Sequence, residues 1–406
     1  MSSQPILPFE TIETIIDTLA QDDPGALSLK ACSLVCQGFL ELCRKHIFAS
    51  ITIDGLAVAV PTPTSAAFVR LLSTTPQIAD HIRELDWNIL VEDFEDRSLP
   101  GILEKITKLQ SLTIYWPRGQ RQWRMNSLRP GILHLLHLPT LIRLEICDSR
   151  DFVFVDLIPC INLREIRLDC TQVVEAEDPF PLTLPKDPLQ LDRLLFGVES
   201  LAAVSRIGTS LRPDGRPIFN LAVLSSISLV LYNYDEFAAS RQLFQHCVQL
   251  TNVDILVHFP LTWTGIAKIL EPSIKTLTHL CFSMSAQDET GTSDPLAGLV
   301  AELEEIRCHR NIIENMTINV YVGACYKCNQ GDDWGLLDSV LTQSGWSRLA
   351  RVSLTISTWN LYHDDATLTS LPQRQLPRLL SISVLSPPKV YTILKLTLGE
   401  NEEVPC

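Results

Sequence analysis

The chain has 406 residues, of which 46% are hydrophobic and 20% are charged, and its formal net charge is -14. A strongly acidic chain repels the phosphates of nucleic acids and of anionic membranes, so we exclude general binding to either. The length and composition are those of a globular protein with room for a small module and one large domain.

The first predicted element is a helix that begins near Pro8. Proline suits the first turn of a helix, and Glu10 and Glu13 oppose the positive end of the helix dipole. The sequence Asp-Asp-Pro-Gly at 22–25 ends this helix. Between these limits one apolar face is formed at helical spacing by Ile12, Ile15, Ile16 and Leu19.

A second helical stretch begins near Ala26 and is apolar on more than one side. One side could form a core, but the rest needs cover, because burying each large aliphatic side chain contributes roughly 1.5 to 3 kcal/mol. Segments of this size rarely fold well alone, so we expect a partner protein or the rest of the chain to cover it. The apolar residues of the stretch are Leu27, Leu29, Ala31, Leu34, Val35, Phe39, Leu40, Leu42 and Cys43.

The segment from Leu7 to Phe48 resembles an F-box. It opens with Leu7, Pro8 and Glu10, continues with isoleucines at helical spacing, and then has a Cys-Ser-Leu-Val-Cys run, Phe39, Arg44 and Ile47-Phe48. The resemblance implies a three-helix module over residues 1–50 that docks on a Skp-type adaptor. The alternative is a helical cap on the next domain. By position in the motif, the adaptor contacts would be Leu7, Pro8, Ile12, Ile15, Ile16, Leu19, Leu34, Val35 and Phe39.

No targeting or membrane-spanning segment is visible in the sequence. The first residues, MSSQPILPFE, lack a basic run followed by an apolar core, and no stretch approaches the roughly 18 apolar residues of a span. The 12 cysteines are sparse, which favours reduced thiols over a disulfide scaffold. We therefore expect a cytoplasmic or nuclear protein.

An apolar triplet recurs along the rest of the chain, in the pattern apolar, two residues, apolar, one residue, apolar. Each copy predicts one short strand whose last two apolar residues point inward. The eleven copies are Ile82-Leu85-Trp87, Leu109-Leu112-Ile114, Leu141-Leu144-Ile146, Leu163-Ile166-Leu168, Leu191-Leu194-Phe196, Leu224-Ile227-Leu229, Leu250-Val253-Ile255, Leu277-Leu280-Phe282, Ile313-Met316-Ile318, Leu349-Val352-Leu354 and Leu379-Ile382-Val384.

This pattern is similar to the core of a leucine-rich repeat. Units of that kind cannot bury their strands alone and stack into a solenoid with a continuous parallel sheet. We therefore predict an α/β fold in which an irregular leucine-rich-repeat solenoid with a curved parallel sheet occupies residues 51–406, with inserted loops at 178–188, 287–295 and 360–377. The asparagine that usually follows the strand is mostly missing, so the repeats are degenerate. An ordinary mixed α/β domain is the alternative.

One segment, 115–130, carries arginines between tryptophans and contains no acidic residue. Arginine beside aromatic residues is common at interface hot spots and pairs with carboxylate or phosphate. The segment could thus bind an acidic or phosphorylated part of a target. The alternative is that the arginines neutralise neighbouring acids while the tryptophans pack over the edge of the repeats. The candidate target-binding residues are Trp116, Arg118, Arg121, Trp123 and Arg124.

Motifs of catalysis are not found. The chain has no phosphate-binding glycine loop, no His-Glu-x-x-His helix and no Gly-x-Ser-x-Gly elbow, so we predict neither an enzyme nor a cofactor. Cys325 and Cys328, with Cys308-His309 upstream, form a weak zinc candidate, and a loop with two free thiols is the alternative.

Taken together, the two resemblances imply the substrate-recognition subunit of an SCF-type cullin-RING ubiquitin ligase. The F-box would bind the adaptor, and the repeats would hold an unknown protein target for ubiquitin-dependent degradation, contributing proximity and no bond chemistry. The alternative is an interaction scaffold that delivers no substrate. The outward strand positions mix both charges and identify no ligand; they include Glu84, Asp86, Arg143, Glu145, Glu165, Arg167, Asp254, His279 and Arg351.

Overall fold

The computed structural model describes residues 8–22, 27–54, 64–117, 122–175, 185–286, 294–322, 333–359, 376 and 391–399, the last range as backbone alone. The chain divides into two compact units. Unit 1 comprises Met1–Arg164 and Val173–Leu189, and unit 2 comprises Glu165–Gln172 and Gln190–Cys406. The predicted boundary between residues 50 and 51 lies inside unit 1.

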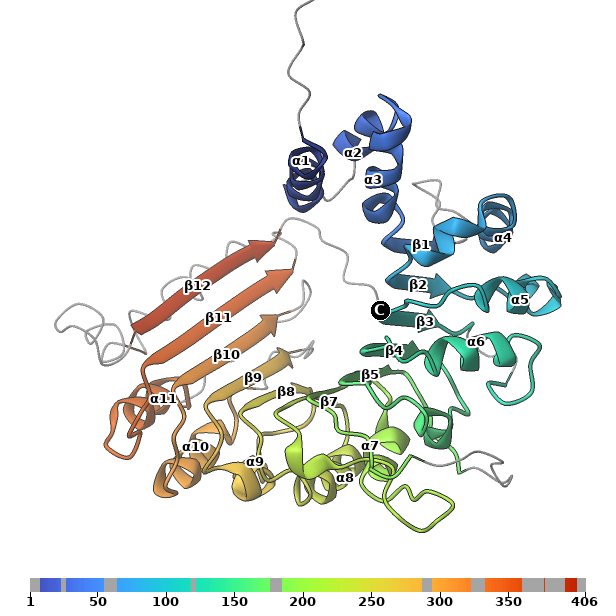
Figure 1. Cartoon of the computed structure of the whole chain (residues 1–406). Coiled ribbons are helices and arrows are strands. Elements are labelled where there is room, and N and C mark those ends of the chain that lie inside the picture. Colours follow the sequence, from blue (N-terminus) through green and yellow to red (C-terminus); the bar gives the residue numbers. More distant parts are fainter. Residues whose placement is uncertain are drawn as a thin grey trace, which may run out of the picture. The chain divides into compact units, whose positions relative to one another are not determined.

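Unit 1 begins with three helices that share a small core of their own. These are α1 (Phe9–Asp22), α2 (Leu27–Ser33) and α3 (Gln37–Ile47). Their side chains meet in a cluster of buried residues, Ile16, Leu29, Leu42 and Cys43. The helices lie next to one another before the first strand (Figure 1).

The rest of unit 1 consists of parallel strands joined by short helices. Each strand pairs with the next one along the chain, so the apolar residues of successive triplets stand in register: Leu85 beside Leu112 and Leu112 beside Leu144. The strands are β1 (Ser50–Asp54), β2 (Glu84–Asn88), β3 (Ser111–Tyr115) and β4 (Arg143–Cys147). The connecting helices are α4 (Ser65–Thr74), η1 (Pro76–Asp80), η2 (Val91–Glu95), α5 (Leu99–Leu103), α6 (Arg129–Leu136) and η3 (Phe154–Leu157).

Unit 2 repeats the same arrangement with longer strands towards its end. Its strands also pair in chain order and in parallel. They are β5 (Glu165–Asp169), β6 (Arg193–Phe196), β7 (Ser226–Leu231), β8 (Asn252–His258), β9 (His279–Ala286), β10 (Asn315–Val322), β11 (Arg351–Trp359) and β12 (Tyr391–Gly399). The helices are α7 (Leu201–Ile207), η4 (Leu221–Val223), α8 (Tyr234–Phe244), α9 (Ile266–Leu270), η5 (Glu271–Ser273), α10 (Leu299–Cys308) and α11 (Asp333–Thr342).

Hydrogen bonds of buried polar groups link neighbouring repeats within unit 2. The carboxylate of Glu302, on α10, accepts hydrogen bonds from the backbone N–H groups of Gly265 and Ala267 at 2.6 and 2.7 Å. These N–H groups lie at the start of α9 and have no partner within that helix, so the neighbouring helix satisfies them. At α8, Asn233 and Glu236 form a capping box instead. Helices α8 and α9 are thus both fixed at their first turns.

The mixed α/β class with parallel strands, predicted from the triplets, is confirmed. Ten triplets coincide with strands β2 to β11, and all of their residues are buried. The eleventh, Leu379-Ile382-Val384, lies outside the described residues, whereas β12 at Tyr391–Gly399 was not predicted. Of the three predicted loops, only residues 185–188, 294–295 and 376 are described. None of the helices in the described ranges has the length and apolar character needed to cross a membrane.

Candidate functional site: apolar side chains of the N-terminal helices

The predicted adaptor contacts fall into two groups, and the first group belongs to the core of the three helices. Ile16 has no exposed surface, and Ile12, Leu19 and Phe39 are partly buried against the same cluster. Most of their apolar surface is therefore buried in the core between α1, α2 and α3. Leu7 lies outside the described residues, and Pro8 is exposed.

The second group projects into solvent. Ile15 is 47% exposed, Leu34 86% and Val35 68%. Two further side chains, which the motif did not assign, share this exposure: Phe9 at 56% and Leu27 at 71%. Each of these two is the first residue of its helix, and this position is the signal that could have identified them. We refer to Phe9, Ile15, Leu27, Leu34 and Val35 as the exposed apolar set.

The backbone of the turn between α2 and α3 explains why Leu34 and Val35 are so exposed. The N–H groups of Leu34 and Val35 donate to the carbonyls of Ala31 and Cys32 at 3.2 and 3.1 Å. These bonds close the turn while the side chain of Cys32 packs against the buried cluster. Cys36 then adopts an extended conformation and begins α3. The turn is therefore an ordered projection, held by hydrogen bonds at its base.

An ionic clip joins α1 to α3. Lys45 lies 2.8 Å from Glu13 and 3.0 Å from Asp17, and His46 lies 2.7 Å from the same Asp17 oxygen. Hydrogen bonds from Lys45, and next from His46, hold the pKa of Asp17 below its usual value. The pKa of Lys45 is raised, chiefly by its hydrogen bond to Glu13. The clip fixes the angle at which the two helices present their outer surfaces.

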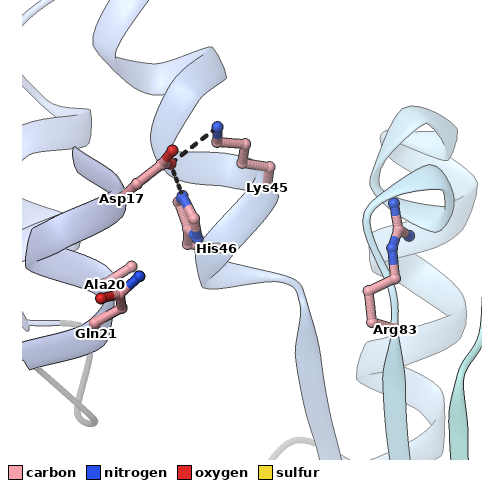
Figure 2. Close-up of a pocket in the computed structure, with 6 residues that line it drawn as sticks. All are labelled: Asp17, Ala20, Gln21, Lys45, His46 and Arg83. Carbon is pink, nitrogen blue, oxygen red and sulfur yellow. Dashed lines mark hydrogen bonds and ion pairs between the residues drawn. The ribbon is translucent and has the colours of Figure 1, made fainter. Parts of the chain in front are cut away.

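The clip also lines an open hollow of about 560 Å³, bounded by Asp17, Ala20, Gln21, Lys45, His46 and Arg83. Figure 2 shows Lys45 and His46 turned towards Asp17, with Arg83 on a separate segment. Arg83 donates to the backbone carbonyls of Asp80 and Ile82 at 2.8 and 3.0 Å. Since the cations around the hollow are bound to acceptors of this chain, we assign it no ligand.

The tryptophans of the arginine-containing segment lie in the interior. Trp116 and Trp123 are 3% and 1% exposed, with ring centroids 5.3 Å apart. The ring of Trp123 also meets Phe152 edge-on at 4.9 Å. These positions agree with the alternative in which the tryptophans serve packing. Arg118 and Arg121 lie outside the described residues, and Arg124 is half-buried.

Part of the weak zinc candidate lies outside the described residues, namely Cys325 and Cys328. Cys308, at the end of α10, is exposed, and the neighbouring His309 is half-buried. Within the part of the chain that the structure describes, no three or more histidine, cysteine, aspartate or glutamate side chains are grouped so that they could hold a metal ion.

Comparison with the known protein families finds none that matches this chain. A search among curated proteins likewise finds no match.

Proposed function

We propose that the chain is a substrate-recognition subunit of an SCF-type cullin-RING ubiquitin ligase and acts in the cytoplasm or nucleus. Its N-terminal helices would be an F-box-like module that docks on a Skp-type adaptor. The repeats, as a degenerate leucine-rich-repeat solenoid, would hold a protein target. The observation that carries this proposal is the exposed apolar set on helices that already possess a core.

The surplus of apolar surface is the first physical argument. The cluster around Ile16 and Cys43 is closed without the help of the exposed apolar set. Burying one such side chain contributes roughly 1.5 to 3 kcal/mol. Covering three of them gives about 4.5 to 9 kcal/mol before entropic costs, which corresponds to affinities between the millimolar and micromolar ranges. Concentration of exposed leucine, isoleucine, valine and phenylalanine on so short a segment favours a protein partner.

The arrangement of the repeats is the second argument. Parallel strands at regular intervals, most of them followed by a short helix, leave one face of the strands free of the helices that cover the other. Such a face suits the recognition of another protein, and the target would be brought near the ubiquitin-charged enzyme by position alone. The described residues need perform no bond chemistry for this role.

The test is recovery of the adaptor and of the cullin with the tagged full-length chain from cells. Wild type is compared with a Leu34→Ser, Val35→Ser double variant. The control is Leu211→Ser, because Leu211 is 57% exposed and belongs to unit 2. We expect wild type and control to retain adaptor and cullin, and the double variant to lose both. If wild type retains no adaptor, the proposal fails; if it retains adaptor without cullin, the chain is an interaction scaffold.

A further inference from the structure

The outward face of strands β7 to β10 in unit 2 carries almost no charge. Along β8, Val253, Ile255 and Val257 are buried, so the alternating residues point to the other face. Figure 1 draws helices α8 to α10 along one side of these strands. The outward residues of the four strands are Ser226, Ser228, Val230, Asn252, Asp254, Leu256, His258, His279, Cys281, Ser283, Ser285, Asn315, Thr317, Asn319 and Tyr321.

Asp254 is the one carboxylate among these outward positions, and its hydrogen bonding is incomplete. Its Oδ2 accepts the hydroxyl of Ser228 at 3.4 Å, which is a long contact. Its Oδ1 is buried and has no hydrogen-bond partner within normal hydrogen-bond geometry. Burial raises the pKa of Asp254, and side-chain hydrogen bonds from the Cys281 thiol and the Ser228 hydroxyl counteract this only in part. Its side-chain donors are thus one distant hydroxyl and one thiol, which is a weak donor, so the carboxylate lacks a strong one.

Neutral groups surround Asp254 on the neighbouring strands. In the sheet register it stands between Ser228 and Cys281. Asn319 directs its amide to Ser283 and Cys281, at 3.1 and 3.5 Å, and so does not supply the missing donor. Burial lowers the pKa of His258 to about 4, so this imidazole is neutral at physiological pH.

No positively charged residue lies beside Asp254 at an outward position of the described strands of unit 2. The nearest ones in the strand order are Arg193 and Arg351. Arg193 is on β6, two strands away, and pairs with Glu165 at 3.3 Å. Arg351 is on β11, three strands away, beside Asn315. A half-buried carboxylate without a neighbouring cation lowers the stability of the fold. Folding alone therefore gives no reason to keep an aspartate at this position.

We propose that Asp254 receives a lysine or arginine side chain of a protein partner that lies across the outward face of β7 to β10. The cation would supply the donors that the carboxylate lacks, and a two-fold rotation about χ2 would bring either oxygen to it. The proposal rests on the proposed function only in that the repeats bind a protein; docking on the adaptor is not involved.

A second feature of the same face gives the partner apolar contact. The ring of Tyr232, which follows β7, stacks on His258 with centroids 3.9 Å apart and planes at 14°. His258 is four residues beyond Asp254 on the same strand face, a distance of about 13 Å at the strand rise. A segment of four or five extended residues spans it. Aromatic residues such as tyrosine are enriched in the central part of interfaces.

The probe is an array of acetylated, amidated peptides of mixed serine, alanine, leucine and tyrosine sequence with one variable central residue. That residue is arginine, lysine, citrulline or acetyl-lysine, so that size is kept while charge is removed. The purified full-length chain is applied as wild type, Asp254→Asn and Glu165→Gln. Glu165→Gln makes the same change of charge on the same face of unit 2, at a carboxylate that already has Arg193.

We expect wild type and Glu165→Gln to retain the cationic peptides about tenfold more strongly than their neutral counterparts. Asp254→Asn should lose this preference while melting at or above the temperature of wild type. The inference is overturned if wild type shows no preference, if Asp254→Asn keeps it, or if Asp254→Asn melts lower, which would make the carboxylate structural. Adaptor retention, measured in parallel on Asp254→Asn, reports on the proposed function separately.

Discussion

Trp123 donates its indole N–H to Oδ2 of Asp156 at 2.8 Å, although the two residues are 33 positions apart in the chain. Asp156 is fully buried, and its carboxylate also receives the guanidinium of Arg129 at 2.8 and 3.1 Å. The segment that the sequence suggested as a binding surface is thus attached to the interior of unit 1, because Trp123 and Arg129 both bind Asp156.

Replacement of Asp156 by alanine should destabilise unit 1 strongly. The change leaves the Trp123 N–H and the Arg129 guanidinium without their acceptor in a buried site, for which we expect a loss of about 3 to 5 kcal/mol in the free energy of unfolding. Urea denaturation followed by tryptophan fluorescence measures it. As control, the exposed Glu104 changed to alanine should alter stability by no more than about 0.5 kcal/mol. Equal effects of the two variants would contradict the anchor.

The sequence could not have placed these tryptophans. A segment rich in tryptophan and arginine is equally common at an interface and over a core. The residue that holds Trp123 in the interior is Asp156, which is distant in the chain and belongs to no recognisable motif. The same holds for Ile15 and Ile16, which are neighbours on one helical face although only Ile16 is enclosed. Which edge of an apolar face becomes covered depends on the angle between α1 and α3, and that angle is fixed by tertiary contacts such as the clip at Lys45.

The strands were more predictable, because their signal is local and repeated. Residues such as Leu112 and Ile114 alternate inward with a period of two, and the repeat of that pattern locates the next strand. No triplet predicted β12 at Tyr391–Gly399, and the last triplet, Leu379-Ile382-Val384, lies outside the described residues.

Two isoleucines beside β4 test the inward assignment. Ile146, within the strand, has no exposed surface, whereas Ile142, just before it, is 42% exposed. Changing Ile146 to alanine should reduce the free energy of unfolding by about 2 to 5 kcal/mol through lost burial and the cavity left behind. Ile142→Ala is the matched control and should cost less than about 1 kcal/mol. Urea midpoints that do not differ between the two would argue against this register.

The clip between α1 and α3 should give acid sensitivity. Because the pKa of Asp17 is lowered in the folded chain from its usual 3.8, its contribution is present above that value and is lost as pH falls through the folded pKa. At neutral pH we expect Asp17→Asn to be less stable than wild type by less than about 1 kcal/mol, since the pair is partly exposed. This difference should vanish once the pH falls below the lowered pKa of Asp17.

Urea titrations of wild type and Asp17→Asn at a series of pH values measure the effect. Asp22→Asn, at the exposed end of the same helix, should follow the pH profile of wild type. A gap between wild type and Asp17→Asn that stays constant down to low pH would show that the carboxylate acts through packing and not through its charge.

The central claim is that the exposed apolar set docks on a Skp-type adaptor, and calorimetric titration of the purified chain with purified adaptor tests it most directly. We predict saturable binding with a negative heat-capacity change, as burial of apolar surface requires. The Leu34→Ser, Val35→Ser variant should bind at least about tenfold more weakly, with an unchanged melting temperature, while Leu211→Ser should bind as wild type does. Absence of binding by wild type, or equal affinity of the double variant, would contradict the account.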